Sequence, residues 1–265
     1  MHLLPGRKLI LLGDGGYASH EFACFFARHQ DRITLVSRFH PDAALYAPAP
    51  TVTRKNPQGG RPRQKGRKLP TPRKAIQGSK LPNAVVAWYS ATMRVVGLAS
   101  GVGLWYKAGE GLVAVRWVFV QDRDGTRRDE YFYTTDVSLS PEAIVGLYMQ
   151  RWSIETMFQE AKGLLGLETT RTWVKTSVLR QAPCLLGLFS VVALIFAEEW
   201  KRRPIRPLQT PWQEKPEITF SDALAAVRRL FWRQTVFAHL AQPDAFQKLP
   251  ALLRRFILDS LARAA

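Results

Sequence analysis

Four side chains in the second half of the sequence could act together on an anionic substrate. Tyr148, Arg151, Glu155 and Lys162 follow the spacing Y-x2-R-x3-E-x6-K. At about 100° per residue they lie within about 60° of one another on a helix. A carboxylate can bind a hard divalent cation, and the cationic side chains on either side can bind an anion. The alternative is a solvated row of ion pairs, since Arg151 and Glu155 are four residues apart.

The residues around these four predict the helix that positions them. Ser140 is a good N-cap, Pro141 suits the first helical position, and Glu142 complements the helix N-terminus. Gly163 and Gly166 are candidate ends, so we expect one long helix between them and Ser140. A second, apolar stripe predicts its contact with the core: Leu147, Ile154, Phe158, Ala161 and Leu165.

An aspartate near the start of the chain is a further candidate. Lys8 to Leu12 is an apolar run followed by Gly13 and Asp14, which predicts a buried strand that delivers Asp14 to the carboxyl edge of a sheet. Ligands of open α/β sheets gather at that edge. The alternative is a turn aspartate that caps the next helix, expected at Ala18 to His29. The run GDGGYA lacks the dinucleotide fingerprint, and Arg32 to Phe39 predicts a second strand.

The charge balance predicts a polyanionic partner. The formal net charge is +17, with nucleic acid as the first candidate and an anionic membrane surface as the second. Only Cys24 and Cys184 are present, which is too few for a disulfide framework and fits a reduced, cytosolic compartment. We expect no signal peptide, because an Asp comes early and no small-residue cleavage site follows.

Most of the positive charge lies in one segment. Ala43 through Gly109 contains twelve Lys or Arg residues and no Asp or Glu. Prolines and a Gly-Gly pair interrupt it, so we expect Ala47 to Gln77 to be a mobile loop without regular structure that neutralises phosphates. The alternative is a solvated insertion without a ligand. The candidate DNA contacts are Arg61, Arg63, Lys65, Arg67 and Lys68.

A β-rich stretch follows the basic segment. Strands are predicted at Ala84 to Leu98, Val102 to Tyr106, Leu112 to Gln121 and Asp129 to Thr135, with DRDG at 122–125 as a hairpin turn. The aromatic residues of this stretch can be core or base-stacking platforms, and we favour core. They are Trp88, Tyr89, Trp105, Tyr106 and Trp117.

The last third of the chain is predicted to be helical. Pro183 to Ala197 is apolar but shorter than a typical membrane span, which favours a buried core helix. Lys201 to Pro216 is a Pro-rich linker. Ile218 to Leu240 and Ala245 to Ala264 are expected to be amphipathic helices with basic faces, which could pack on the body, dimerise or contact DNA.

Residues Tyr131 to Val192 resemble bacterial insertion-sequence transposases of the DDE type, in the group related to IS-four-like elements. The resemblance lies in the Y-R-E-K box, in TTDVSLSPEAIV before it, in RWSIETMFQEAKGLLGLETTRTW through it, and in the apolar helix after it. Asp14, followed by Gly16 and Tyr17, resembles the second catalytic aspartate of that family.

The resemblance implies a function and a set of site residues. The reaction is DNA strand cleavage and strand transfer at a site with two Mg²⁺ or Mn²⁺ ions. Asp14 and Glu155 would be catalytic residues and metal ligands. Arg171 lies in the family-like ETTRTW and is a further candidate phosphate contact, or a surface arginine without a ligand. The implied DNA contacts are Tyr148, Arg151, Lys162 and Arg171.

The resemblance also implies an α/β (α+β) fold with a ribonuclease-H-like catalytic core. We expect this core to be N-terminally incomplete, with a β-rich insertion and a helical C-terminal region. Residues 1–40 would form a partial core with Asp14, and 41–128 the basic loop and β-rich insertion. Residues 129–200 would form the return strand and the glutamate helices, and 201–265 the C-terminal helical region.

The sequence departs from the family pattern at the first aspartate of the triad. That residue is expected on an earlier strand, but no acidic residue precedes Asp14. We therefore expect a truncated transposase that is inactive alone. A non-catalytic DNA-binding regulator or inhibitor is the alternative. A membrane-surface protein is disfavoured, because no basic amphipathic anchor is evident.

These interpretations predict the partners and the location. We expect double-stranded DNA, at element ends and target, together with a homodimer or a heteromer with full-length transposase. We expect no membrane partner, and a cytoplasmic location on the bacterial nucleoid.

Overall fold

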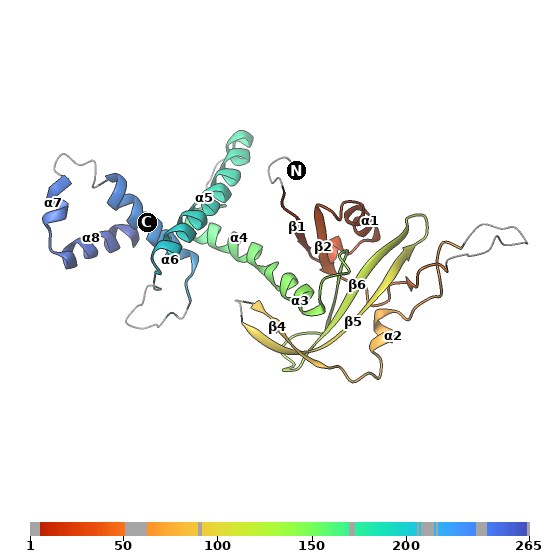
Figure 1. Cartoon of the computed structure of the whole chain (residues 1–265). Helices are drawn as coiled ribbons and strands as arrows, with labels where there is room; N and C mark the ends of the chain where they lie inside the picture. Colours follow the sequence, from red (N-terminus) through yellow and green to blue (C-terminus); the bar gives the residue numbers. More distant parts are fainter. Residues whose placement is uncertain are drawn as a thin grey trace, which may run out of the picture. The chain divides into compact units, whose positions relative to one another are not determined.

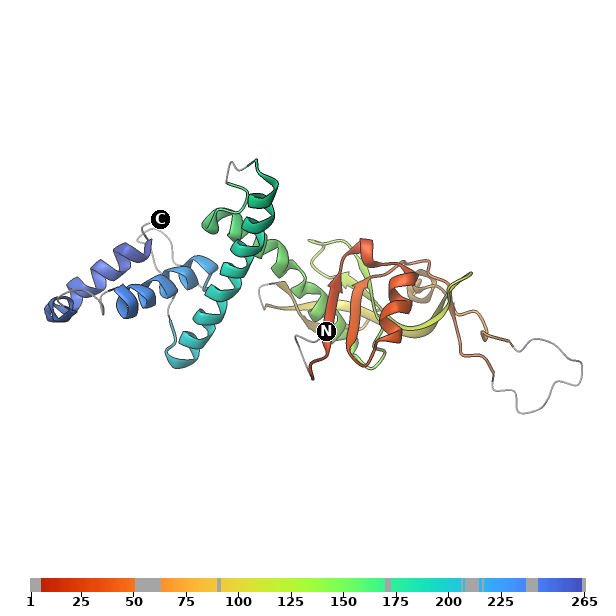
Figure 2. The same cartoon turned by 90° about the horizontal axis from the view of Figure 1, so that it is seen from above.

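The computed structural model describes residues 6–50, 63–89, 92–169, 173–205, 207, 215, 217–236 and 243–263. The chain divides into two compact units, Met1–Ser153 and Ile154–Ala265. Figures 1 and 2 show the sheet of the first unit in red to green and the helices of the second in green to blue.

The first unit is built on a mixed sheet of seven strands among its described residues. The order is β1-β2-β7-β6-β5-β3, and β4 pairs with β5 outside this path. The predicted α/β class is confirmed. The strands are β1 (Leu9–Gly13), β2 (Ile33–Arg38), β3 (Leu45–Tyr46), β4 (Asn83–Ala87), β5 (Met93–Lys107), β6 (Gly111–Asp122) and β7 (Glu130–Thr134).

The two predicted N-terminal strands form the parallel pair β1–β2, with Leu9 opposite Ile33 and Gly13 opposite Ser37. The helix α1 (His20–Arg28) connects them, as expected for a parallel crossover. β2 continues into the antiparallel part of the sheet through β7. The strand before Asp14 is confirmed, but the expectation that it is buried is wrong. β1 is the edge strand of the described sheet, so its apolar side chains Ile10 and Leu11 are exposed.

Alternate residues of each strand point to opposite faces of the sheet. Each face packs against a helix. On one face, Trp105, Trp117 and Tyr133 pack with α1. On the other, Val118 and Phe132 pack with α3 (Pro141–Gln150). Burial in the core is confirmed for Trp105 and Trp117, whereas Trp88, Tyr89 and Tyr106 are only half-buried.

The two predicted strands Ala84 to Leu98 and Val102 to Tyr106 are wrong in their bounds. The chain turns between β4 and β5, where the amide of Trp88 donates to the carbonyl of Thr92 at 2.8 Å. β5 then runs unbroken through Gly101, which lies against the indole of Trp117: a Cβ there would be 2.8 Å from that ring. The apparent break LASGVG is therefore a place of close packing. The predicted turn at 122–125 joins β6 to β7.

The basic segment is more ordered than predicted wherever it is described. The amide of Gly66 donates to the carbonyl of Ala47 and the amide of Ala47 to the carbonyl of Arg67, both at 2.9 Å. A short helix, α2 (Pro72–Ile76), follows with Thr71 as its N-cap. The expectation of no regular structure over Ala47 to Gln77 is therefore wrong for this part, because the backbone pairs with the chain after β3.

The second unit is helical. Val192 of α5 packs with Ala223 and Leu224 of α6 in a small apolar core. Thr219 and Asp222 form a capping box at the start of α6, in which the Thr219 amide donates to Asp222 at 2.9 Å. The helices are α4 (Trp152–Leu165), which begins in the first unit, α5 (Lys175–Arg202), α6 (Phe220–Phe231), α7 (Pro243–Lys248) and α8 (Ala251–Arg263), with the π-helical turn η3 (Trp232–Val236) after α6.

Two predictions about the helices are wrong. The helix expected to run unbroken from Ser140 is two helices, α3 and α4, separated at Arg151. α5 is longer than predicted and is not a buried core helix, since Val192 is its one buried residue. By length and composition alone, α5 could cross a membrane. A single such helix is weak support for a membrane span.

Candidate functional site

The carboxyl edge of the parallel pair brings the first site residues together. Asp14 directly follows β1, and Arg38 is the last residue of β2. Because Gly13 is opposite Ser37, Asp14 and Arg38 are level at this edge. Asp14 is exposed, and its Oδ1 accepts a hydrogen bond from the Gly16 amide at 2.9 Å. Its carboxylate thus points into the turn at the end of the strand.

The alternative prediction is that Asp14 caps the following helix. Asp14 does act as a cap, but of a short turn and not of α1. Asp14 caps the 3-10 turn η1 (Gly15–Tyr17), whereas Ser19 caps α1 and accepts from the Phe22 amide. The turn needs glycine at position 13, because a Cβ there would be 2.6 Å from the Cβ of Tyr17. The Ser37 hydroxyl donates to the carbonyl oxygen of Asp14 at 2.9 Å, which ties the turn to β2.

The start of α3 forms as the sequence predicts. The Ser140 hydroxyl accepts from the Ala143 amide at 3.2 Å, and Pro141 occupies the first turn. At the other end, the Arg151 amide donates to the carbonyl of Tyr148 at 3.0 Å, three residues back. This tighter turn ends α3 without a glycine or a proline. It places Tyr148 and Arg151 at the end of one helix rather than along a continuous face.

Tyr148 is a buried residue, contrary to the expectation of a polar face. It is 3% exposed, and its ring packs on Phe132 with 4.2 Å between centroids. Its hydroxyl accepts from Nε of Arg38 at 3.0 Å, and Nη2 of Arg38 donates to Glu130 at 2.6 Å. Sequence reasoning missed Arg38. Its position at the end of the predicted second strand, level with Asp14, is the signal that could have identified it.

A cavity of about 320 Å³, the Tyr148 pocket, opens beside this cluster. Aromatic rings and arginines line it together with the carboxylates of Asp122 and Glu130. The Arg127 guanidinium lies 5.0 Å from the ring centroid of Tyr89, which packs edge-on against Trp152. Burial raises the pKa of the Tyr89 phenol, so it stays neutral. The pocket combines guanidinium forks with aromatic faces, which suits phosphate groups and bases. Its lining includes Arg38, Trp88, Tyr89, Arg127, Arg128, Tyr148, Arg151 and Trp152.

A buried carboxylate, Asp122, supports one wall of the pocket. Its side chain is 1% exposed, and it accepts from the Arg127 amide at 2.7 Å and the Thr126 hydroxyl at 3.0 Å. Arg94 forms an ion pair with it at 2.8 Å. Burial alone would raise the pKa of Asp122, but these hydrogen bonds and the Arg94 charge hold it below its usual value. The charged carboxylate therefore organises the turn that carries Arg127.

The remaining predicted site residues are divided over the chain. Glu155 and Lys162 belong to α4 in the second unit, where Lys162 forms an ion pair with Glu168 at 2.7 Å. Glu155 is half-buried. Arg171 and Arg61 lie outside the described residues. The structure therefore places Asp14 level with Arg38 and joins Arg38 to Tyr148 by a hydrogen bond. The roles assigned to Asp14, Glu155 and Lys162 stay predictions.

The described basic residues of the 43–109 segment do not behave alike. Arg63, Arg67 and Lys68 are exposed, as phosphate contacts require. Lys65 instead lies over two aromatic rings, with Nζ 3.6 Å from the centroid of Tyr106 and 4.5 Å from that of Tyr46. Its ammonium is therefore already engaged in cation–π contacts.

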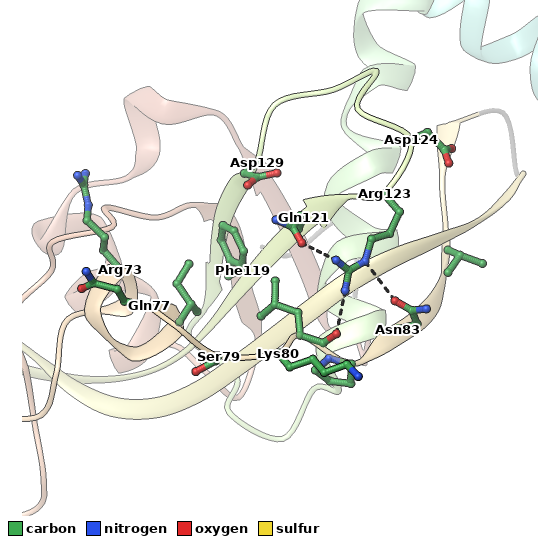
Figure 3. A pocket seen from close by; sticks show the side chains of 14 residues that line it. Arg73, Gln77, Ser79, Lys80, Asn83, Phe119, Gln121, Arg123, Asp124 and Asp129 are labelled. Carbon is green, nitrogen blue, oxygen red and sulfur yellow. Dashed lines mark hydrogen bonds between the residues drawn. The ribbon is translucent and has the colours of Figure 1, made fainter.

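An open groove of about 1350 Å³ lies on the sheet face opposite α3 (Figure 3). Arg123 crosses it and donates to Leu81, Asn83 and Gln121 at 2.8, 3.1 and 2.6 Å. All three acceptors belong to the protein, so Arg123 joins β4 to the end of β6. The groove is lined by basic side chains, Arg73, Lys80 and Arg123, together with the acidic side chains Asp124 and Asp129.

The described residues contain no group of three or more side chains suited to hold a metal ion. The carboxylates of Asp14 and Glu155 are hard oxygen donors of the type that Mg²⁺ prefers. Each belongs to a different unit, and no second acidic side chain accompanies Asp14 in its turn. The donor chemistry fits a divalent cation but the described set is incomplete, so we assign no step to a bound metal.

Comparison with protein families decides the family. The model described as Transposase DDE domain matches residues 1–175, about two thirds of the chain. The chain belongs to the transposase DDE domain family. No curated protein matches it. The match covers the whole first unit of the transposase chain and continues through α4, so the predicted relationship to DDE transposases is confirmed. The mixed sheet with helices on both faces agrees with a ribonuclease-H-like transposase domain.

Proposed function

We propose that this chain acts in DNA transposition as a member of the bacterial, IS-four-like group, and that it holds DNA at the Tyr148 pocket. The arrangement of this pocket is the observation that carries the proposal. Arg38, Arg127 and Arg151 line the pocket with aromatic rings, at the sheet edge where Asp14 follows β1. Guanidinium groups bind phosphate in a planar fork, and aromatic rings accept bases by stacking.

The roles of the individual groups follow from their chemistry. Arg127 and Arg151 neutralise phosphates, and the bond from Arg38 to the Tyr148 hydroxyl keeps that guanidinium in a fixed orientation. Asp14 and Glu155 would each offer a carboxylate to the divalent metal ions that this family generally uses. When bound, such ions would activate an attacking oxygen and stabilise a leaving oxygen at phosphorus. Lys162, Arg171 and the exposed part of the basic segment add sequence-independent affinity.

We propose further that the chain tested alone binds DNA without cutting it. A DDE reaction needs three carboxylates, and the sequence patterns that resemble the family supply two, Asp14 and Glu155. The absence of a metal-ligating cluster among the described residues favours the same conclusion. A second candidate function follows from it: a regulatory transposase derivative that occupies DNA ends, or that associates with full-length transposase, on the bacterial nucleoid.

The DNA-binding part is tested by salt titration against duplex DNA. We expect Arg151→Ala to weaken binding by about tenfold at moderate salt and to reduce the salt slope by about one. Arg127→Ala should act similarly. Arg28→Ala is the matched control, because Arg28 is an exposed arginine of α1, on the sheet face opposite α3. Equal losses for Arg28→Ala and Arg151→Ala would contradict the placement of DNA at the Tyr148 pocket.

The catalytic part is tested with a nicking assay on matched element ends, with Mg²⁺ and with Mn²⁺. We expect binding without product. Metal-dependent cleavage that Glu155→Ala abolishes would show that the chain holds a complete site and would overturn the proposal of an inactive chain.

A further inference from the structure

The outer face of α5 carries a pattern that the functions above do not use. Six residues follow one another at spacings of four, three, four, three and four: Arg180, Cys184, Gly187, Val191, Leu194 and Glu198. At about 100° per residue they fall within about 40° of one line along the helix. All six are exposed within the second unit. Below, they are called the α5 stripe.

The opposite face of α5 packs against α6. Val192 is buried against Ala223 and Leu224 of α6, and the rings of Phe189 and Phe220 stack with 4.1 Å between centroids. This packing defines the inner side of α5 and leaves the α5 stripe pointing away from it. A membrane-spanning α5 would have to give up this core, so the apolar composition of the stripe indicates a protein partner.

The α5 stripe is symmetric about its centre, residue 189. Reversing the helix direction exchanges Arg180 with Glu198, Cys184 with Leu194, and Gly187 with Val191. Two copies packed antiparallel across a two-fold axis would therefore place a small side chain opposite a large one at each inner position. They would also place opposite charges together at both ends. A self-complementary surface of this kind is what an isologous dimer interface requires.

Two further observations point to a second helix on this face. Gly187 is in the middle of α5, where glycine is a poor helix former, and a Cβ on it would meet no described atom within 4 Å. No close packing within the described chain requires a glycine at this position, whereas a partner helix could approach the α5 backbone closely there. Arg180 has no ion-pair partner among the described residues, and the exposed Glu198 carboxylate pairs only with its neighbour Lys201 there.

We propose that the chain forms a homodimer through antiparallel pairing of the α5 stripe with the same stripe of a second copy. The axis passes near residue 189, and Arg180 of each copy lies beside Glu198 of the other. The two charged residues are 18 positions apart, about 27 Å along the helix, which is five whole turns. The proposal specifies the self-association expected of this family member, but it rests on α5 alone and does not depend on DNA binding.

Charge reversal in sedimentation equilibrium experiments tests the pairing. The full chain is measured from about 1 to 100 μM, and we expect a monomer–dimer equilibrium. Arg180→Glu and Glu198→Arg should each weaken the dimer by about tenfold or more, because each creates two like-charge contacts in the symmetric dimer. The double variant carrying both changes should restore the dimer. A parallel pair would not show this rescue, because it places Arg180 beside Arg180.

Apolar and control variants complete the test. Val191→Lys should give a monomer with unchanged helix content, since Val191 is exposed in the isolated unit. Ala197→Lys, also exposed and about 120° from Val191 around the helix, should leave the dimer intact. Labelling of the exposed Cys184 thiol should slow as protein concentration rises. A monomer at 100 μM, no rescue in the double variant, or sedimentation of the chain with lipid vesicles would each overturn the proposal.

Discussion

Replacing Asp122 by alanine should strongly destabilise the first unit. Its carboxylate is 1% exposed and accepts hydrogen bonds from the Arg127 amide at 2.7 Å and the Thr126 hydroxyl at 3.0 Å. It also pairs with Arg94. Each hydrogen bond to a charged group contributes about 1.5–3 kcal/mol. Removal of one partner of a buried pair costs about 3–5 kcal/mol. Arg94 keeps its ion pair with Asp124, so its charge is not left without a partner. We therefore expect a loss at the lower end of this range, about 3 kcal/mol in the free energy of unfolding.

The neighbouring Asp124 provides the matched control. It pairs with the same guanidinium nitrogen of Arg94 at 2.9 Å, but its side chain is 64% exposed. Exposed ion pairs contribute about 0–1 kcal/mol, so Asp124→Ala should cost no more than that. The two variants therefore separate burial and hydrogen bonding from simple charge pairing.

Urea unfolding read by hydrogen exchange in peptides from β6 would measure these losses in the first unit alone. With a slope of about 2 kcal/mol per molar urea, Asp122→Ala should lower the midpoint by about 1.5 M. Asp124→Ala should lower it by less than about 0.5 M. Equal shifts for the two variants, or a shift below about 0.5 M for Asp122→Ala, would refute the reasoning.

Three further predictions concern the stability of the two units. The hydrogen bond from Lys8 lowers the pKa of the Asp136 carboxyl in the folded state. The charged carboxylate therefore stabilises the fold fully above the pKa of the unfolded state, about 4, and this stabilisation is lost as pH falls through the lower pKa of the folded state. Urea midpoints from pH 6 to pH 2.5 should show this loss, and Lys8→Met should reduce it. Gly13→Ala should cost about 1–3 kcal/mol, because its Cβ would meet Tyr17 at 2.6 Å, and an unchanged midpoint would contradict this. Gly163→Ala should instead stabilise α4 by about 0.5–1 kcal/mol, measured by exchange in α4 peptides, because open space surrounds that position.

Local patterns predicted many elements of the chain correctly. The apolar run before Gly13 became β1, and Ser140 with Pro141 set the start of α3. These signals are local: period-two and period-3.6 burial, N-cap chemistry and the φ preference of proline act within a few residues. The membership in the transposase family could also be predicted, because the motif text around Tyr148 is specific.

Other features depended on contacts between distant residues. Gly101 continues β5 because the indole of Trp117 packs on it, and no neighbouring residue encodes that contact. α5 is apolar enough to suggest burial, yet the described chain covers only one of its faces. Composition gives the total apolar surface of a helix, whereas only packing decides how much of it is covered.

The same division applies to the candidate site. The sequence by itself determined the residue types, their spacing, the strand that ends at Asp14 and the excess of positive charge. Only the tertiary structure decided that Tyr148 is buried and that its hydroxyl accepts from Arg38, 110 residues away in the chain. The same holds for Asp122 and the turn that carries Arg127. The physical reason is that the partner of a buried polar group is chosen by sheet register and helix packing, which bring together residues far apart in the sequence.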